Sequence, residues 1–157
     1  MIQTIFCQVL GWHLHIFGLQ TQMEIFGGTK MNTTKQVIVM RRDLKMRRGK
    51  EIAQGSHATM AFLTQKLNTN SPLTLITLTS IQRNWLTSSF RKVCVRVNSE
   101  EELCDIVAKA KTAGIEVHLV IDDGLTEFKG ISTPTCAAIG PDYDERIDQI
   151  TGHLELY

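Results

Sequence analysis

Apolar runs and amphipathic stretches follow one another from about residue 36 to the end of the chain. The β-branched run 36–40, Gln-Val-Ile-Val-Met, predicts a central strand that is buried on both faces. From Gly49 to about Lys66, apolar residues recur at intervals of three and four, which predicts an amphipathic helix. Residues 68–90 are rich in Asn, Thr and Ser, and they predict a loop with at most one extra turn or strand.

The second half of the chain predicts three further strands and two helices. Residues 93–97 alternate valine with other residues, which is typical of a strand with one wetter face. Ser99 and Glu102 form a capping box that opens a helix, and Gly114 stands where that helix should end. The remaining predicted elements are an alternating strand over 115–121, an apolar strand over 135–139, and a helix that Pro141 opens and Gly152 closes.

The predicted order is therefore β-α-β-α-β-β-α. Strands joined by helices form right-handed crossovers, so the expected class is α/β, with a three-layer α/β/α sandwich around a mixed, mainly parallel four-stranded sheet. Ligands of such sheets bind beyond the carboxyl ends of the strands. Residues 41–50 and 122–135 follow two such ends, and we expect the chemistry there.

The first 34 residues differ from the rest in composition. Among residues 1–30 only Glu24 and Lys30 are charged, and no helix or strand period runs through them. They lack the basic start and cleavage site of a secretory signal, and their apolar run is too short to span a membrane. We expect a folded domain over residues 35–157 and an N-terminal extension over residues 1–34. The extension either lies outside the folded domain, as an upstream segment or the result of a mis-assigned start, or is a peripheral hydrophobic arm. Met31 is a candidate for the natural start.

Composition narrows the class of protein. A chain of 157 residues with 43% hydrophobic and 21% charged residues is typical of one compact domain. The net charge of +1 gives no global attraction to nucleic acid. The cysteines lack the spacing of a zinc site or a Cys-x-x-Cys pair, so we expect reduced thiols of a cytoplasmic protein, with three of them in the core. The four are Cys7, Cys94, Cys104 and Cys136, and the last three lie in apolar segments.

Positive charge is concentrated just after the first predicted strand. Six of the seventeen cationic side chains lie within residues 41–50, where only Asp43 opposes them. Such a cluster at a helix N-terminus favours phosphate, although a solvated basic loop is an equally good interpretation of the spacing. Gly49-Lys50 lacks the spaced glycines and the Ser or Thr of a nucleotide-binding loop, which disfavours a nucleotide-dependent enzyme. The six are Arg41, Arg42, Lys45, Arg47, Arg48 and Lys50.

Other polar positions are ambiguous when taken alone. A helical histidine such as His57 is more often structural than catalytic, and Asp-Gly after Asp122 commonly makes a turn. Thr126, Thr133 and Thr135 suit a strand without any further role. Spacing by itself leaves the function open.

Several short motifs nevertheless occur together in a particular order. They are Lys35–Arg41, Asp43–Met46, Gly49–Lys50, Ala53–Ala58, Asp122 with Gly124 and Thr126, Thr135, Ile139–Pro141 and Thr151–Tyr157. In this order they resemble the archaeal/eukaryotic-type peptidyl-tRNA hydrolase, the second and structurally distinct class of that enzyme. The resemblance extends from residue 35 to residue 157, and the first thirty residues have no counterpart in it.

The resemblance implies an activity and a set of site residues. The activity is metal-independent, cofactor-free hydrolysis of the ester that joins a peptide to the terminal ribose of tRNA. By position, Lys50, Asp122, Thr126 and Thr135 correspond to residues important for activity. His57 corresponds to a frequent family histidine, and we count it among the catalytic candidates. The residues expected to bind tRNA are Arg41, Lys45, Arg47 and Arg48. Peptidyl-tRNA is the implied partner, no membrane is implied, and a homodimer stays open.

Four positions depart from the family pattern. Arg47 and Arg48 stand where a glycine and a lysine are usual, and Leu125 stands where a basic residue is frequent. Asp123 adds a second negative charge, and we expect it to raise the pKa of Asp122. The alternative function is a catalytically inactive tRNA-binding module of the same fold, but the retained lysine, aspartate and threonines favour the enzyme.

Overall fold

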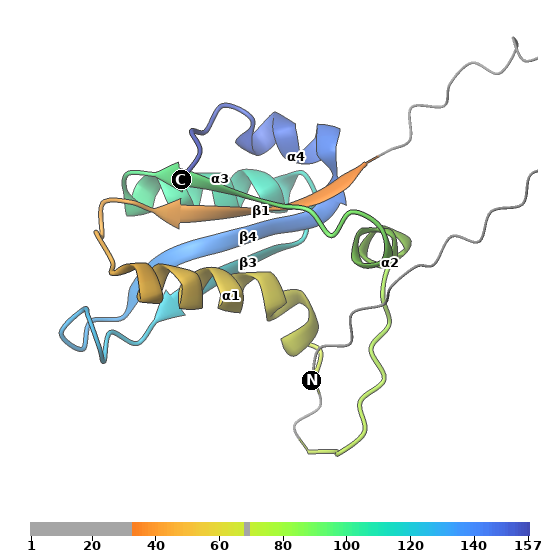
Figure 1. Ribbon diagram of the computed structural model, residues 1–157, viewed down its shortest axis with the longest axis horizontal. Helices are drawn as coiled ribbons and strands as arrows, with labels where there is room; N and C mark the ends of the chain where they lie inside the picture. The colour runs from red at the N-terminus through yellow and green to blue at the C-terminus, as the bar shows by residue number, and fades with distance from the viewer. Residues whose placement is uncertain (1–32, 68–69) are drawn as a thin grey trace, which may run out of the picture. The chain divides into compact units, whose positions relative to one another are not determined.

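The computed structural model describes residues 33–67 and 70–157, and Figure 1 shows how their elements are arranged. The expectations for residues 1–32, including Cys7, lie outside the described residues. The elements are β1 (Thr34–Arg41), α1 (Arg48–Thr64), α2 (Ser80–Thr87), β2 (Lys92–Val97), α3 (Glu100–Thr112), β3 (Val117–Asp122), β4 (Thr133–Tyr143) and α4 (Asp144–Thr151).

The sheet has four strands in the order β2-β1-β4-β3, which confirms a mixed four-stranded sheet. The expectation that it is mainly parallel is wrong, because only the β1–β2 pair is parallel and β4 is antiparallel to both of its neighbours. A loop rather than a helix joins β3 to β4, so β4 returns beside β3 and enters the sheet next to β1. Strands β1, β2 and β3 still run in one direction, which places their carboxyl ends at one edge.

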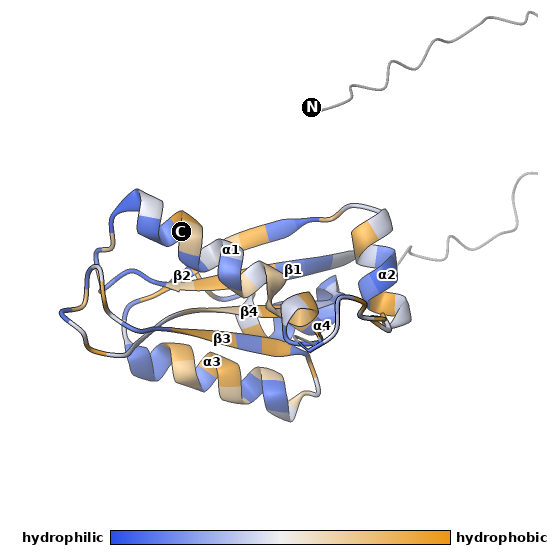
Figure 2. Ribbon diagram, turned by 90° about the horizontal axis from the view of Figure 1, so that it is seen from below, coloured by the Kyte–Doolittle hydropathy of each residue, from blue (hydrophilic) through white to orange (hydrophobic). Residues whose placement is uncertain are grey.

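Helices cover both faces of this sheet, so the expected α/β/α sandwich is confirmed (Figure 2). Val37 and Val39 of β1 face α3 and α4, where they pack in one cluster with Leu103. Ile38, with Met40, faces α1 and packs in a second cluster with Ala58. Alternate side chains of β1 therefore pack into two separate hydrophobic cores, one on each face of the sheet. Within the described residues, no helix is long and apolar enough to cross a membrane.

The segment predicted to be a loop contains the helix α2, so that expectation is wrong. Thr79 accepts a hydrogen bond from the Gln82 amide, and the Gln82 side chain accepts one from the Thr79 amide, which completes a capping box. Trp85 is fully buried, and its ring lies 5.8 Å from that of Phe62 in α1. Burial of this one large side chain fixes an otherwise polar helix to the domain.

The last strand is longer than expected, and the last helix begins later. Pro141 lies inside β4, and α4 starts only at Asp144, so the expectation that Pro141 opens this helix is wrong. The β1–β4 register shifts between Lys35 and Val37, opposite Gly140 and Pro141. That irregularity accommodates a proline, which has no N–H to donate to the sheet.

The cysteines are only partly where we expected them. Cys136 is buried in β4, whereas Cys94 and Cys104 are exposed, so their expected place in the core is wrong. Cys94 lies on the edge strand β2, and Cys104 lies on the outer side of α3, next to the buried Leu103. An apolar neighbour in the sequence, such as the valines beside Cys94 or the leucine beside Cys104, therefore does not establish that a cysteine is buried.

Candidate active site

Two predicted residues meet at the carboxyl edge of the sheet. Lys50 lies in the first turn of α1, which follows β1, and Asp122 is the last residue of β3. The Lys50 Nζ and Asp122 Oδ2 atoms are 2.5 Å apart. Both side chains are largely enclosed, with 15% and 13% of their surface exposed. An ion pair in such a place is less screened than one on an open surface.

The loop after β3 supplies further contacts to this pair. The Thr126 hydroxyl oxygen accepts a hydrogen bond from Lys50 Nζ at 3.2 Å. The Gly124 amide donates to Asp122 Oδ1 at 2.9 Å. Gly124 has a φ of 78°, and a Cβ there would lie 2.3 Å from the Ile131 carbonyl oxygen. Glycine is therefore required for the loop to close against the carboxylate.

Gln54 links the ion pair to Thr135, although the site predicted from the sequence did not include it. Its Nε2 donates to Asp122 Oδ2 at 2.9 Å, and its Oε1 accepts from the Thr135 hydroxyl at 2.6 Å. Gln54 and Thr135 are both buried. The available signal was spacing, because Gln54 follows Lys50 by four residues and so shares its side of the helix.

The environment of Asp122 lowers the pKa of its carboxyl group. The hydrogen bond from Lys50 is the largest cause, and the Gly124 amide and the Gln54 side chain act in the same direction, while burial opposes them. The expectation that Asp123 raises this pKa is therefore wrong. Asp123 is exposed, where water screens its charge, while Lys50 contacts the carboxylate directly.

The lowered pKa of the Asp122 carboxyl group predicts how stability and kcat/KM depend on pH. The charged form of Asp122 is favoured in the folded protein, so its contribution to stability is present above the ordinary value of 3.8 and is lost as pH falls through the lowered one. We expect no inflection of kcat/KM from Asp122 between about pH 5 and 8. An NMR titration of the Asp122 carboxyl carbon beside the pH–rate profile checks this. Matching inflections above pH 5 would contradict it.

His57 lies apart from this hydrogen-bonded cluster. It is exposed on α1, and its side chain makes no hydrogen bond or ion pair with another described residue. It follows Lys50 by seven residues, so it lies about 10 Å further along the helix axis. Its role in catalysis stays a prediction.

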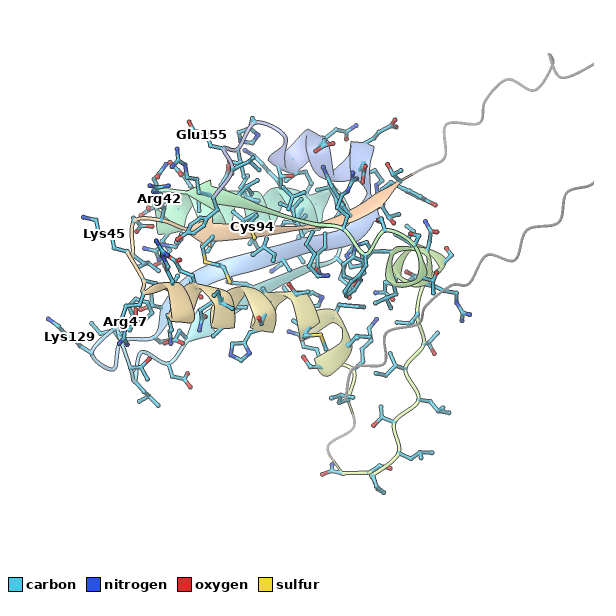
Figure 3. All side chains as sticks on the ribbon, in the orientation of Figure 1. Arg42, Lys45, Arg47, Cys94, Lys129 and Glu155 are labelled. Atoms are coloured by element: carbon cyan, nitrogen blue, oxygen red, sulfur yellow. The ribbon has the colours of Figure 1, made fainter. Side chains whose placement is uncertain are left out.

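Four cationic side chains point outward near the end of β1 and the start of α1 (Figure 3). They are Arg42, Lys45, Arg47 and Lys129, of which Lys129 was not singled out by the sequence analysis. Arg47 is 79% exposed, and its Nε donates to Glu127 Oε1 at 2.7 Å. Arg48 is also exposed. The Glu127 side chain is only 14% exposed, so this pair joins an exposed guanidinium to a largely enclosed carboxylate. The predicted contact of Arg47 with tRNA stays a prediction.

Arg41 differs from these cations because its side chain is only 9% exposed. Its guanidinium binds Asp43 at 2.7 Å and Glu100 at 2.9 Å, and it also donates to the Pro134 carbonyl oxygen. The hydrogen bond to Asp43 is the main reason its pKa is raised. This placement supports a structural role between β1, α3 and β4, and the predicted contact of Arg41 with tRNA stays untested.

The fold and the polar cluster define an α/β protein with a charged site at one edge of its sheet. Residues 34–157 match the family model "Peptidyl-tRNA hydrolase PTH2", and the chain belongs to this family. The match covers every described element.

Curated relatives agree with the family model. A peptidyl-tRNA hydrolase of Methanocaldococcus jannaschii is 43% identical, over 78% of this chain and 98% of its own. A mouse protein named "Peptidyl-tRNA hydrolase 2, mitochondrial" is 35% identical over 94% of this chain and 84% of its own. That share exceeds residues 34–157, so the alignment reaches into the segment before residue 34, contrary to our expectation that it has no counterpart.

A solved structure shares the fold at low sequence identity. It is a protein of unknown function from an Agrobacterium strain, C58, and it is 13% identical with a TM-score of 0.50. The match covers 79% of this chain and 97% of the other. At this identity the likeness concerns the fold alone.

Proposed function

We propose that this protein hydrolyses the ester between peptide and tRNA at the cluster around Lys50 and Asp122. The observation that carries the proposal is the 2.5 Å contact between these side chains in a chain of the peptidyl-tRNA hydrolase family. Gln54, Thr126 and Thr135 complete a continuous hydrogen-bonded group around it. All five side chains come from one copy of the chain, and a homodimer stays a prediction.

The Asp122 carboxylate has one acceptor direction that no described residue uses. Its two oxygens offer about four lone-pair directions, and Lys50, Gln54 and Gly124 occupy three of them. We assign the remaining direction, on Oδ1, to the attacking water. The carboxylate accepts a proton from this water as the water oxygen adds to the ester carbonyl carbon. Because the pKa of Asp122 is low, the carboxyl group passes the proton on to the departing ribose oxygen.

Lys50 stabilises the negative charge that this addition creates. Its ammonium has three N–H donors, of which Asp122 and Thr126 take two. The third donor has no hydrogen-bond acceptor among the described residues and is available for the carbonyl oxygen. A charged donor already held in place is effective because it need not reorganise during the reaction.

The tRNA itself is held by the cations beside the site. Lys45, Arg47 and Arg48 are exposed at the start of α1, where the free amides of the helix N-terminus add to their charge.

The exposed thiols of Cys94 and Cys104 suit a reducing compartment, and we propose that the protein is located in the cytoplasm.

Cleavage of a purified N-acetyl-aminoacyl-tRNA tests the proposed function. The full chain should release the acylated amino acid from tRNA, and it should do so equally well with EDTA present. Binding of tRNA without release of the amino acid would instead favour the inactive tRNA-binding module.

Salt dependence tests the predicted tRNA contacts. Replacing both Arg47 and Arg48 by alanine should weaken tRNA binding and reduce the slope of log affinity against log salt by up to about two phosphate contacts. Lys111→Ala is the matched control, because Lys111 is an exposed cation of α3, on the opposite face of the sheet. If the slope is unchanged in the double variant, these arginines are solvated side chains only.

A further inference from the structure

The loop between β3 and β4 exposes two large aliphatic side chains. Leu125 is 85% exposed and Ile131 is 66% exposed. The loop between them is ordered by its own hydrogen bonds, because the Phe128 and Gly130 amides donate to the Gly124 carbonyl and the Ile131 amide donates to the Phe128 carbonyl. Their exposure is therefore a property of a closed loop.

Leu125 lies at the edge of the proposed catalytic cluster. The residue before it, Gly124, donates its amide to Asp122, and the residue after it, Thr126, accepts from Lys50. Both neighbours of Leu125 thus contact the charged pair. The backbone of Ile131 lies against Gly124, so the backbone positions that carry the two aliphatic side chains are close together.

The chemistry of these side chains distinguishes between the parts of a peptidyl-tRNA. Aliphatic groups offer nothing to phosphate or ribose, and unpaired bases are usually recognised by stacking on aromatic rings or arginine planes. The aromatic residue of the loop, Phe128, is partly buried and faces the Lys50 ammonium at 5.9 Å. An apolar amino-acid side chain next to the ester is the part of the substrate that gains most by leaving water against Leu125 and Ile131.

We infer that Leu125 and Ile131 are specificity-determining residues that favour peptidyl-tRNAs whose ester-linked residue has an apolar side chain. The inference rests on the proposed function, because it places the ester at Lys50 and Asp122. The preference is moderate, since the surface is open and only part of each side chain is covered.

Two substrates on one tRNA sequence test this inference. The full chain should cleave N-acetyl-leucyl-tRNA with a kcat/KM about three- to tenfold higher than that for N-acetyl-seryl-tRNA, as expected for partial burial of a few methylene groups. Leu125→Ser should bring this ratio close to one by lowering the leucyl value. Leu75→Ser is the matched control, because Leu75 is 93% exposed in the segment before α2 and should leave the ratio unchanged.

The outcomes separate the possible failures. Equal values for the two substrates in an otherwise active wild-type protein would overturn the inference and leave the proposed function standing. If Leu125→Ser lowers both values equally, the side chain contacts a part common to both substrates, such as the terminal nucleoside, and the inference is wrong. No cleavage of either substrate would contradict the proposed function itself.

Discussion

Lys50→Ala and Asp122→Asn should each lower kcat/KM for peptidyl-tRNA cleavage by about a hundredfold or more, because positioned proton acceptors and charged donors are each worth about that much. Lys50→Ala removes the donor assigned to the carbonyl oxygen and leaves Asp122 without its ion-pair partner. Asp122→Asn keeps the shape of the side chain but removes the charge that orients the water. Steady-state kinetics with N-acetyl-aminoacyl-tRNA measure both effects.

His57→Ala is the control for these variants, because His57 lies on the same helix outside the hydrogen-bonded cluster. It should lower kcat/KM much less than either of them. Circular dichroism and thermal melts should show that all three variants remain folded. Full activity of Asp122→Asn would remove this residue from the reaction.

Trp85→Ala should lower the free energy of unfolding by about 3–5 kcal/mol, the usual cost of removing a large buried aromatic side chain. The ring is fully buried between Phe62 and Phe90, and its Nε1 donates to the Arg91 carbonyl at 2.8 Å. The variant leaves a cavity and a carbonyl group without its donor. We expect the melting temperature to fall by about 10 °C or more.

The same variant should retain most of its activity at a temperature where it is folded. Ser89, two residues after the end of α2, donates its hydroxyl to the Thr34 carbonyl at the start of β1, whereas the charged pair lies beyond the other end of that strand. Leu75→Ala, at a fully solvated position nearby in sequence, should leave the melting temperature unchanged. A stable Trp85→Ala protein would mean that α2 is dispensable for the domain.

Local sequence patterns predict the layers of this fold well and its strand directions less well. The apolar run of β1 and the Ser99 N-cap of α3 are local signals, and both elements form where expected. The expected capping box is only half formed, because the Ser99 hydroxyl accepts from the Glu102 amide whereas the Glu102 carboxylate accepts from the Asn98 amide. The position of β4 between β1 and β3 depends on pairing with β1 across some hundred residues, as in Val39 with Ala137. No local pattern records that choice.

The sequence of the short helix α2 contains a helix-start motif, although the polar composition of its segment favours a loop. The Asn-, Thr- and Ser-rich segment favours a loop, yet Thr79 and Gln82 have the spacing of a capping box, and Trp85 follows three residues later. The sequence therefore held a helix start within a polar stretch.

Some residues of the candidate site could be predicted from the sequence, and others could not. Lys50 follows β1 and Asp122 ends β3, and the shared direction of these strands brings the two residues together as expected. The role of Gln54 was not predicted, because its contact with Thr135, 81 residues later in the chain, forms only in the folded protein. Arg41 is part of a basic run in sequence, but its ion pairs with Asp43 and Glu100 become apparent only in three dimensions.

The central claim, that Lys50 and Asp122 act as one unit on the ester, is tested most directly by a double-variant cycle. Single-turnover cleavage of N-acetyl-aminoacyl-tRNA should be measured for the wild type, Lys50→Ala, Asp122→Asn and the double variant. Residues that act as a unit give strongly non-additive losses, so the double variant should be no slower than about the worse single variant. Losses that multiply in the double variant would contradict the account, because they would show that each residue acts without the other.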